Sequence, residues 1–342
     1  MPSTPNSHPT LLSKTLGALL GVHAGDSLGA TLEFMPWEKI QSKYPNGHRI
    51  ITGGGPFNWT PGHATDDTDL TRAVLLAYQD YIIWKTSSDF NSSEPPFDIT
   101  KSAADYSLRW MQGNWPDREP GSGPQDIGNA TWIGLSNYQS SGNARNCGAG
   151  NGKAGNGSLM RCIPSALFEE SSARRKMESM EISAITHNDA RCTVACAAYN
   201  EIVAAMVVGK TAREAVQIGQ RVAEDLDCPA VVRAFEKGKE TSVLKLAGWG
   251  PGNDFPDAMS GYVLESLTLA IAAVLDSRSF EDILVDVVRI GGDTDTNGAI
   301  AGGLLGARDG VEAIPKQWLE VLQFRKEFET VTRKILELQG RI

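Results

Sequence analysis

The chain has 342 residues and a formal net charge of −9, and 41% of its residues are hydrophobic while 21% are charged. This length can bury a substantial core, as one large domain or as two ordinary ones. The acidic balance argues against a general nucleic-acid binder or a protein of anionic membrane surfaces, because both carry basic patches. No apolar run approaches the roughly 18 residues that span a bilayer, so no membrane partner is expected.

The first ten residues are polar and rich in proline, and they resemble neither a secretory signal nor a transit peptide. We expect residues 1–10 to be a disordered tail and residues 11–342 to form one domain. The five cysteines show no CxxC pair and no zinc-ligand spacing, so buried thiols in a reducing compartment are the expected state. These features predict an intracellular protein, in the cytoplasm or the nucleus.

Apolar spacing predicts a first helix from Leu11 to about Ala30, with many small residues in it. Glu33 follows this helix between the apolar residues Leu32 and Phe34. A carboxylate in that position is either a solvated helix end or part of a buried site. The local pattern by itself favours the solvated helix end.

A loop over residues 45–64, rich in glycine and proline, leads into the acidic motif Thr65-Asp66-Asp67-Thr68-Asp69. This motif opens a helix with a regular apolar face, made by Leu70, Val74, Tyr78 and Tyr81. Threonine and aspartate are favoured at helix N-termini, so this motif alone is adequately explained by capping.

A polar connection at 85–97 precedes a helix at about 102–111, and Asp126 and Asn129 follow it ahead of another predicted helix. Asp126 has the residue type of a helix N-cap. The glycine-rich segment 148–161 could cradle a phosphate with its backbone N–H groups, or it could be a flexible connector. It matches neither a Walker A loop nor a Rossmann fingerprint.

The rest of the chain is helical in pattern. His187 lies at the start of a predicted helix that has Val194, Ala198, Ile202 and Met206 on one face and that Gly209 ends. A histidine in that position is more often packed than catalytic. Thr211 and Glu214 have the spacing of a capping box. Two further helices are predicted at about 258–275 and about 317–338.

A second acidic motif, Gly291-Gly-Asp-Thr-Asp-Thr-Asn-Gly298, lies between an apolar helical face at 280–288 and a run of small residues. Carboxylates crowded into such a bend repel one another unless a cation compensates. Oxygen ligands suit Mg²⁺, Mn²⁺ or Ca²⁺. The motif also matches the start of an EF-hand loop, but the required Glu at position twelve is replaced by Leu304.

The two acidic motifs are about 230 residues apart, so they can share a site only within one compact unit. No sustained alternation of period two, no heptad run and no internal repeat is present. The sequence therefore predicts a single compact all-α domain in which both motifs jointly bind two divalent ions.

Several motifs in order resemble the ADP-ribosylglycohydrolase family over roughly residues 12–310. They are Gly25-Asp26 with Glu33, Thr65-Asp-Asp-Thr68, Asp126-Ile-Gly-Asn129, Gly155-Asn-Gly-Ser-Leu-Met-Arg161, Thr186-His187, Gly261-Tyr-Val263 and Gly291-Gly-Asp-Thr-Asp-Thr296. The resemblance implies an orthogonal all-α fold, a binuclear Mg²⁺ or Mn²⁺ centre, and hydrolysis of the glycosidic bond from the distal ribose of ADP-ribose.

The resemblance also implies roles for single residues. The implied metal ligands are Thr65, Asp66, Asp67, Asp293, Asp295 and Thr296. Glu33 would act beside the metals as a gate or an acid/base residue, with Asp67 and Asp295 as further catalytic groups. The implied substrate-binding residues are Asp126, Asn129, Gly155, Asn156, Gly157, Ser158, His187 and Tyr262.

The expected partners are ADP-ribose and ADP-ribosylated proteins, with no nucleic acid, bound by a monomer. The linkage stays open between arginine, serine and other ADP-ribose conjugates. A protein that binds magnesium and ADP-ribose as a sensor, without catalysis, is the alternative. Release of ADP-ribose from modified protein distinguishes the two.

Overall fold

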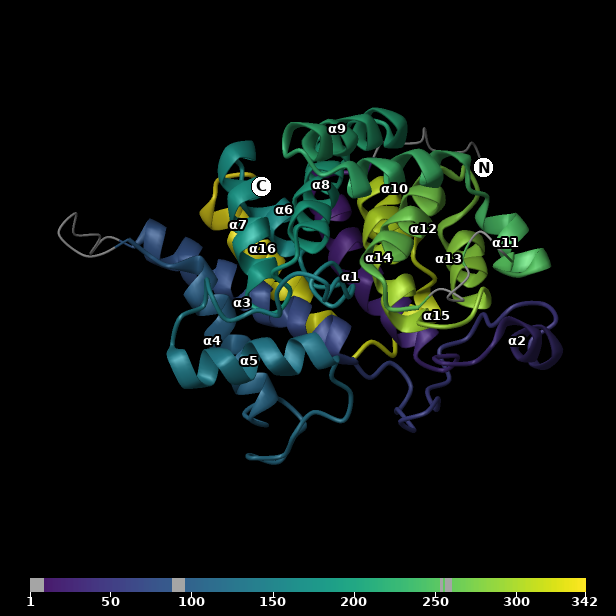
Figure 1. The fold of residues 1–342 in the computed structure, drawn as a ribbon, viewed down its shortest axis with the longest axis horizontal. Helices are drawn as coiled ribbons and strands as arrows, with labels where there is room; N and C mark the ends of the chain where they lie inside the picture. Colours follow the sequence, from purple (N-terminus) through teal and green to yellow (C-terminus); the bar gives the residue numbers. More distant parts are fainter. Residues whose placement is uncertain (1–8, 88–95, 253–254, 256–259) are drawn as a thin grey trace, which may run out of the picture.

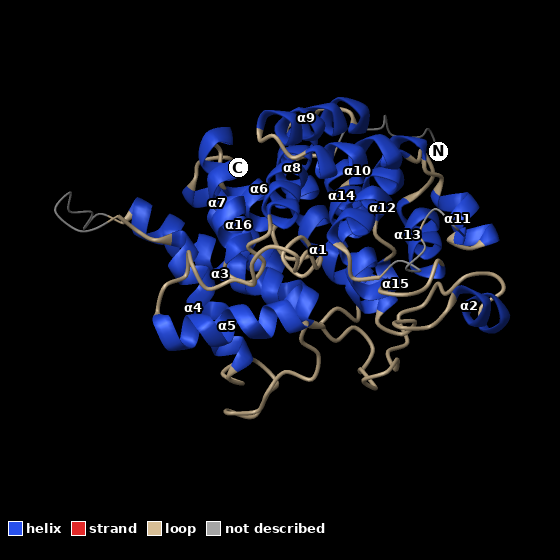
Figure 2. Cartoon of the chain, in the orientation of Figure 1, coloured by secondary structure: helices blue, strands red, loops and turns tan. Residues whose placement is uncertain are grey.

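The computed structural model describes residues 9–87, 96–252, 255 and 260–342. Within these residues the regular structure is helical, and Figure 2 shows no strand among them. The β pairing there consists of isolated bridges, such as that between Gly54 and Trp59. The elements are α1(Leu11–Gly29), α2(Trp37–Lys43), α3(Asp66–Thr86), α4(Ile99–Met111), α5(Asn129–Ser141), α6(Pro164–Phe168), α7(Ser172–Ala184), α8(Ala190–Val207), α9(Ala212–Asp225), α10(Pro229–Glu240), α11(Val243–Trp249), α12(Val263–Leu275), α13(Phe280–Arg289), α14(Thr294–Asp309), η2(Val311–Ala313), α15(Lys316–Leu319) and α16(Arg325–Leu338).

Helix α1 lies in the middle of the molecule, where Figure 1 shows it beside α14. Every residue from Thr15 to Gly29 is buried, because apolar and small side chains surround this helix on all sides. Helices α3, α8, α13 and α16 pack around it, and α12 covers α14. One apolar cluster runs through all of these helices. The all-α, single-domain expectation is therefore confirmed.

A stripe of glycines lets α1 and α14 touch backbone to backbone. A Cβ added to Gly21 would lie 2.2 Å from the Gly302 carbonyl oxygen, and one added to Gly25 would lie 2.0 Å from that of Gly298. Because successive glycines of α1 meet earlier positions of α14, the two helices are antiparallel. The end of α1 consequently lies beside the start of α14, where the second acidic motif is found.

The prediction of one helix at about 317–338 is wrong, since the structure has α15 and α16 with a break between them. Hydrogen bonds from the break to distant segments of the chain keep it out of a helical conformation. Gln323 donates its backbone N–H to Gly62 O at 3.0 Å and accepts from the Ala64 N–H at 3.0 Å through its side chain. The Phe324 N–H donates to Nε2 of His23 at 3.3 Å.

Other local predictions are confirmed, including the capping box of Thr211 and Glu214 at the start of α9. The five cysteines are free and buried. Most of the predicted tail, part of the 85–97 connection and the predicted start of the helix at about 258 lie outside the described residues. Among the helices that are described, none combines the length and apolar character needed to cross a membrane.

Candidate active site

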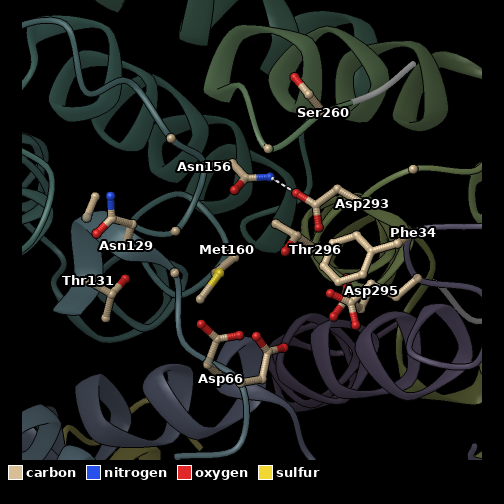
Figure 3. Close-up of a pocket in the computed structure, with 18 of the residues that line it drawn as sticks. Phe34, Asp66, Asn129, Thr131, Asn156, Met160, Ser260, Asp293, Asp295 and Thr296 are labelled. Atoms are coloured by element: carbon tan, nitrogen blue, oxygen red, sulfur yellow. Dashed lines mark hydrogen bonds between the residues drawn. The ribbon is translucent and has the colours of Figure 1, made fainter. Parts of the chain in front are cut away.

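The two acidic motifs meet at one cavity of about 720 Å³. Asp66 at the start of α3 and Asp293, Asp295 and Thr296 at the start of α14 all line it, and Figure 3 shows these side chains projecting into a common space. The motifs are also in direct contact, because the Thr296 hydroxyl donates to Oδ2 of Asp67 at 3.3 Å. The predicted meeting of distant segments is thus present in the fold.

The local structure of α3 explains how the first motif is held. Thr65 is the N-cap, and its hydroxyl oxygen accepts from the Asp67 N–H at 3.3 Å. Oδ2 of Asp26, at the end of α1, accepts from the Thr65 N–H at 3.1 Å and also from the Thr68 hydroxyl. A carboxylate suits these free N–H groups at a helix N-terminus. The residue pattern around Asp26 did not indicate this role.

The second motif is not a calcium loop. Helix α14 begins at Thr294, so the residues that would form the rest of an EF-hand loop are helical. The turn after α1 is tied to this motif, since the Phe34 N–H donates to Gly292 O at 2.8 Å and the Gly292 N–H to Met35 O at 3.2 Å. Phe34 has a left-handed backbone with φ of 58°. This turn directs Glu33 towards Asp295.

A second group of carboxylates forms around Glu33. Oxygen atoms of Glu33, Asp126 and Asp295 all lie within 4.8 Å of one another, a spacing that could hold a metal ion. Asp126 does not cap α5, whose N-cap is Gly128 without a side-chain bond. Its capping interpretation is therefore wrong, and its side chain lies in the cavity instead.

Several oxygen atoms of these carboxylates lack a hydrogen-bond partner among the residues that the structure describes. Oε2 of Glu33, Oδ1 of Asp67 and Oδ1 of Asp295 are buried and have no hydrogen-bond partner in the described part of the chain. Burial, reinforced by Asp126 and other nearby carboxylates, raises the pKa of Glu33 to about 9. Burial first, and then neighbouring carboxylates, raise the pKa values of Asp67 and Asp295 well above their usual range.

The donor set fits a hard divalent cation. Within the residues that the structure describes, no lysine or arginine forms an ion pair with these carboxylates. Buried carboxylates without a countercharge destabilise a fold. The unpaired oxygens are the ligand type that Mg²⁺ and Mn²⁺ prefer.

The glycine-rich segment forms the opposite wall of the cavity. Asn156 joins it to the acidic motif, since its Nδ2 donates to Oδ2 of Asp293 at 2.7 Å and to the Ser266 hydroxyl at 3.0 Å. A Cβ at Gly157 would lie 2.9 Å from Cε1 of His187. Glycine is therefore required where the loop crosses this ring. Burial lowers the pKa of His187 to about 3, so the imidazole is neutral.

The cavity contains most of the predicted substrate-binding residues, namely Asp126, Asn129, Gly155, Asn156, Gly157 and His187. Ser158 and Tyr262 do not line it. The Ser158 hydroxyl is buried and accepts from Ser183 at 2.8 Å, and the Tyr262 hydroxyl accepts from Arg191 at 3.3 Å.

Other residues of the cavity wall had no role predicted from the sequence, among them Phe34, Thr131, Lys153 and Met160. Figure 3 shows the first two and Met160 around the cavity. Phe34 was noted only as a neighbour of Glu33. Lys153 is a cation within the glycine-rich segment, which is a signal for an anionic ligand. Thr131 lies in an ordinary helical sequence, where nothing local indicates a ligand, whereas Met160 belongs to the motif at 155–161 that resembles the family.

Fold and site together define an all-helical protein with an acidic cavity, walled by a glycine-rich loop, whose carboxylates could hold a divalent cation. The chain belongs to the ADP-ribosylglycohydrolase family, whose model matches residues 7–341.

Several named proteins are similar to this chain over most of its length. The chain is 29% identical, over 94% of both proteins, to ADP-ribosyl-[dinitrogen reductase] glycohydrolase of Rhodospirillum rubrum. It is 28% identical to ADP-ribosylarginine hydrolase Tri1 of Pseudomonas putida (strain GB-1), over 95% of this chain and 78% of the relative. A solved structure, titled ADP-ribosylglycohydrolase-related protein complex, matches with a TM-score of 0.73 and 27% identity, over 96% of this chain and 98% of that one. The family resemblance is confirmed.

Proposed function

We propose that this protein is a metal-dependent hydrolase that releases ADP-ribose from ADP-ribosylated protein side chains. The observation that carries the proposal is the meeting of Asp67 and Asp295 in one acidic centre, with buried oxygens that lack a partner. The names of the relatives from Rhodospirillum rubrum and Pseudomonas putida support the same activity.

The proposed metal ligands are Thr65, Asp66, Asp67, Asp293, Asp295 and Thr296. When bound, two Mg²⁺ or Mn²⁺ ions would orient ribose hydroxyls and lower the pKa of a water molecule. The chain itself arranges these oxygens at two helix N-termini, and Asn156 ties the glycine-rich wall to the same centre.

Glu33 and Asp126 are suited to proton transfer in this reaction. Their carboxyl groups lie within 4.8 Å of each other. Burial raises both pKa values, to about 9 for Glu33 and about 6 for Asp126, and more neighbouring carboxylates add to the shift of Glu33. One group can hold a proton while the other is ionised, as general acid–base cleavage of a glycosidic bond requires. The cavity wall of Asn129, Asn156 and His187 would bind the rest of ADP-ribose.

The test is a release assay on arginine-linked and serine-linked ADP-ribose, with Mg²⁺ and Mn²⁺ in parallel. We expect release that stops on chelation and in Asp295→Ala. Binding of ADP-ribose to the same protein is measured by calorimetry in parallel. Tight binding by folded wild-type protein without any release would favour the sensor alternative and contradict the proposed function.

A further inference from the structure

A second, smaller cavity of about 270 Å³ adjoins the acidic centre. Its walls come from the loop before α3 and the loop between α4 and α5. Asp66 and Asp126 line this cavity as well as the first one. Asp66 and Asp126 are therefore a wall that the two cavities share.

The side chains around the second cavity favour a cation. They include Asp66, Asp69, Asp117, Glu119 and Asp126 against the single arginine Arg118. The guanidinium of Arg118 holds the loop, donating to Trp110 O at 2.7 Å and Ser122 O at 2.5 Å. The acidic side chains around the cavity outnumber this one arginine, so the field within it is negative.

The carboxylates differ in their availability. Asp69 is buried and accepts from the indole N–H groups of Trp110 and Trp115, both at 2.8 Å. Asp117 and Glu119 are exposed at the cavity wall. Asp117 accepts one bond, from Gln323 at 2.9 Å through Oδ2. These two side chains can consequently pair with a cationic group that enters from solvent.

The cavity also has a fixed aromatic surface. The ring of Trp59 stacks on His63, with centroids 4.9 Å apart and an interplanar angle of 20°. Two backbone hydrogen bonds of 2.8 Å join Trp59 to Gly54, and Gln125 donates to Phe57 O at 2.5 Å. The backbone of this segment is thus held by hydrogen bonds, and one face of the indole rests on the His63 ring before any ligand binds. An indole face and carboxylates are the surroundings that a planar guanidinium prefers.

We propose, on the basis of the proposed function, that this second cavity receives the acceptor side chain and selects the guanidinium of ADP-ribosylated arginine. With ADP-ribose in the first cavity and its distal ribose at the acidic centre, the acceptor extends past Asp66 and Asp126. Serine is short and neutral and would leave Asp117 and Glu119 without a charged partner. In the reaction, water gives its hydroxyl to the anomeric carbon and its other hydrogen to the departing guanidinium nitrogen.

The experiment compares steady-state kinetics on ADP-ribosylarginine and on an ADP-ribosylserine peptide. In Glu119→Gln we expect KM for the arginine substrate to rise about fivefold, the effect of one partly exposed ion pair. In Trp59→Leu we expect a rise of about tenfold, since a cation loses its aromatic face. The dissociation constant of free ADP-ribose should stay unchanged in both variants, because it fills only the first cavity.

Glu236→Gln is the matched control, because Glu236 is exposed on α10 and lies outside both cavities. It removes the same charge and should leave every constant as in the wild type. Glu119 is exposed, so its variant tests recognition without disturbing the core.

The outcomes separate this inference from the function on which it rests. Release from arginine with the KM changes above supports it. Release from the arginine substrate with KM unchanged in both Glu119→Gln and Trp59→Leu overturns this inference. Release from the serine substrate alone also overturns it. Either result leaves the proposed hydrolase function intact. No release from either substrate overturns the proposed function and this inference together.

Discussion

Gly25→Ala tests whether close packing of α1 on α14 shapes the acidic centre. The added Cβ would lie 2.0 Å from the Gly298 carbonyl oxygen and 2.3 Å from its carbon. An ordinary contact needs 3.4 Å or more, so the helices must separate by roughly 1.4 Å. Overpacking of this kind costs about 1–3 kcal/mol or more, which exceeds the gain of about 1 kcal/mol in helix propensity from glycine to alanine.

The same separation moves Asp295 away from Asp67. A displacement of about 1 Å in an active site can lower the rate about a hundredfold. Urea unfolding gives the stability, and release of ADP-ribose gives kcat. Gly248→Ala is the control, because a Cβ there meets no atom within 4 Å and the residue is in α11, so alanine should be neutral or stabilising. If Gly25→Ala were as stable and as active as the wild type, backbone contact between α1 and α14 would not position this centre.

Three further predictions follow from the site and its surroundings. In the presence of a chelator, Asp67→Asn should be more stable than the wild type by about 1–3 kcal/mol, because it removes a buried carboxylate. Added Mg²⁺ should stabilise the wild type and not the variant. Thermal melts with and without Mg²⁺ check both statements. Asn156→Ala loses its bond to Asp293, so kcat/KM should fall about 10- to 100-fold, and unchanged kinetics would contradict the role given to this amide. His23 is fully buried, and burial lowers its pKa from 6.5 to about 3. Only the unfolded chain then takes up its proton as the pH falls below 6.5, so stability is lost on acidification. Against His23→Gln, the wild type should lose about 1.4 kcal/mol more between about pH 7.5 and about pH 5.5 in urea unfolding, and equal losses would refute this explanation.

The acidic centre shows where local sequence is informative. Thr65, Asp66 and Asp67 have residue types that fit a helix N-terminus, and the structure places them there. The likeness of two such motifs indicated a shared site. Asp126 shows the limit, because its residue type is equally compatible with capping, and only the path of its loop brings it within 4.8 Å of Glu33 and Asp295.

The sequence by itself determined the helices, the all-α class and the family, because apolar spacing, caps and ordered motifs are properties of neighbouring residues. Only the tertiary structure decided the break between α15 and α16, the position of Asp126 in the cavity, the bond of Tyr262 with Arg191 and the second cavity beside Trp59. The physical reason is that these features depend on contacts between segments far apart in the chain. Local residue patterns do not specify which distant segment will supply a hydrogen bond or form the wall of a cavity.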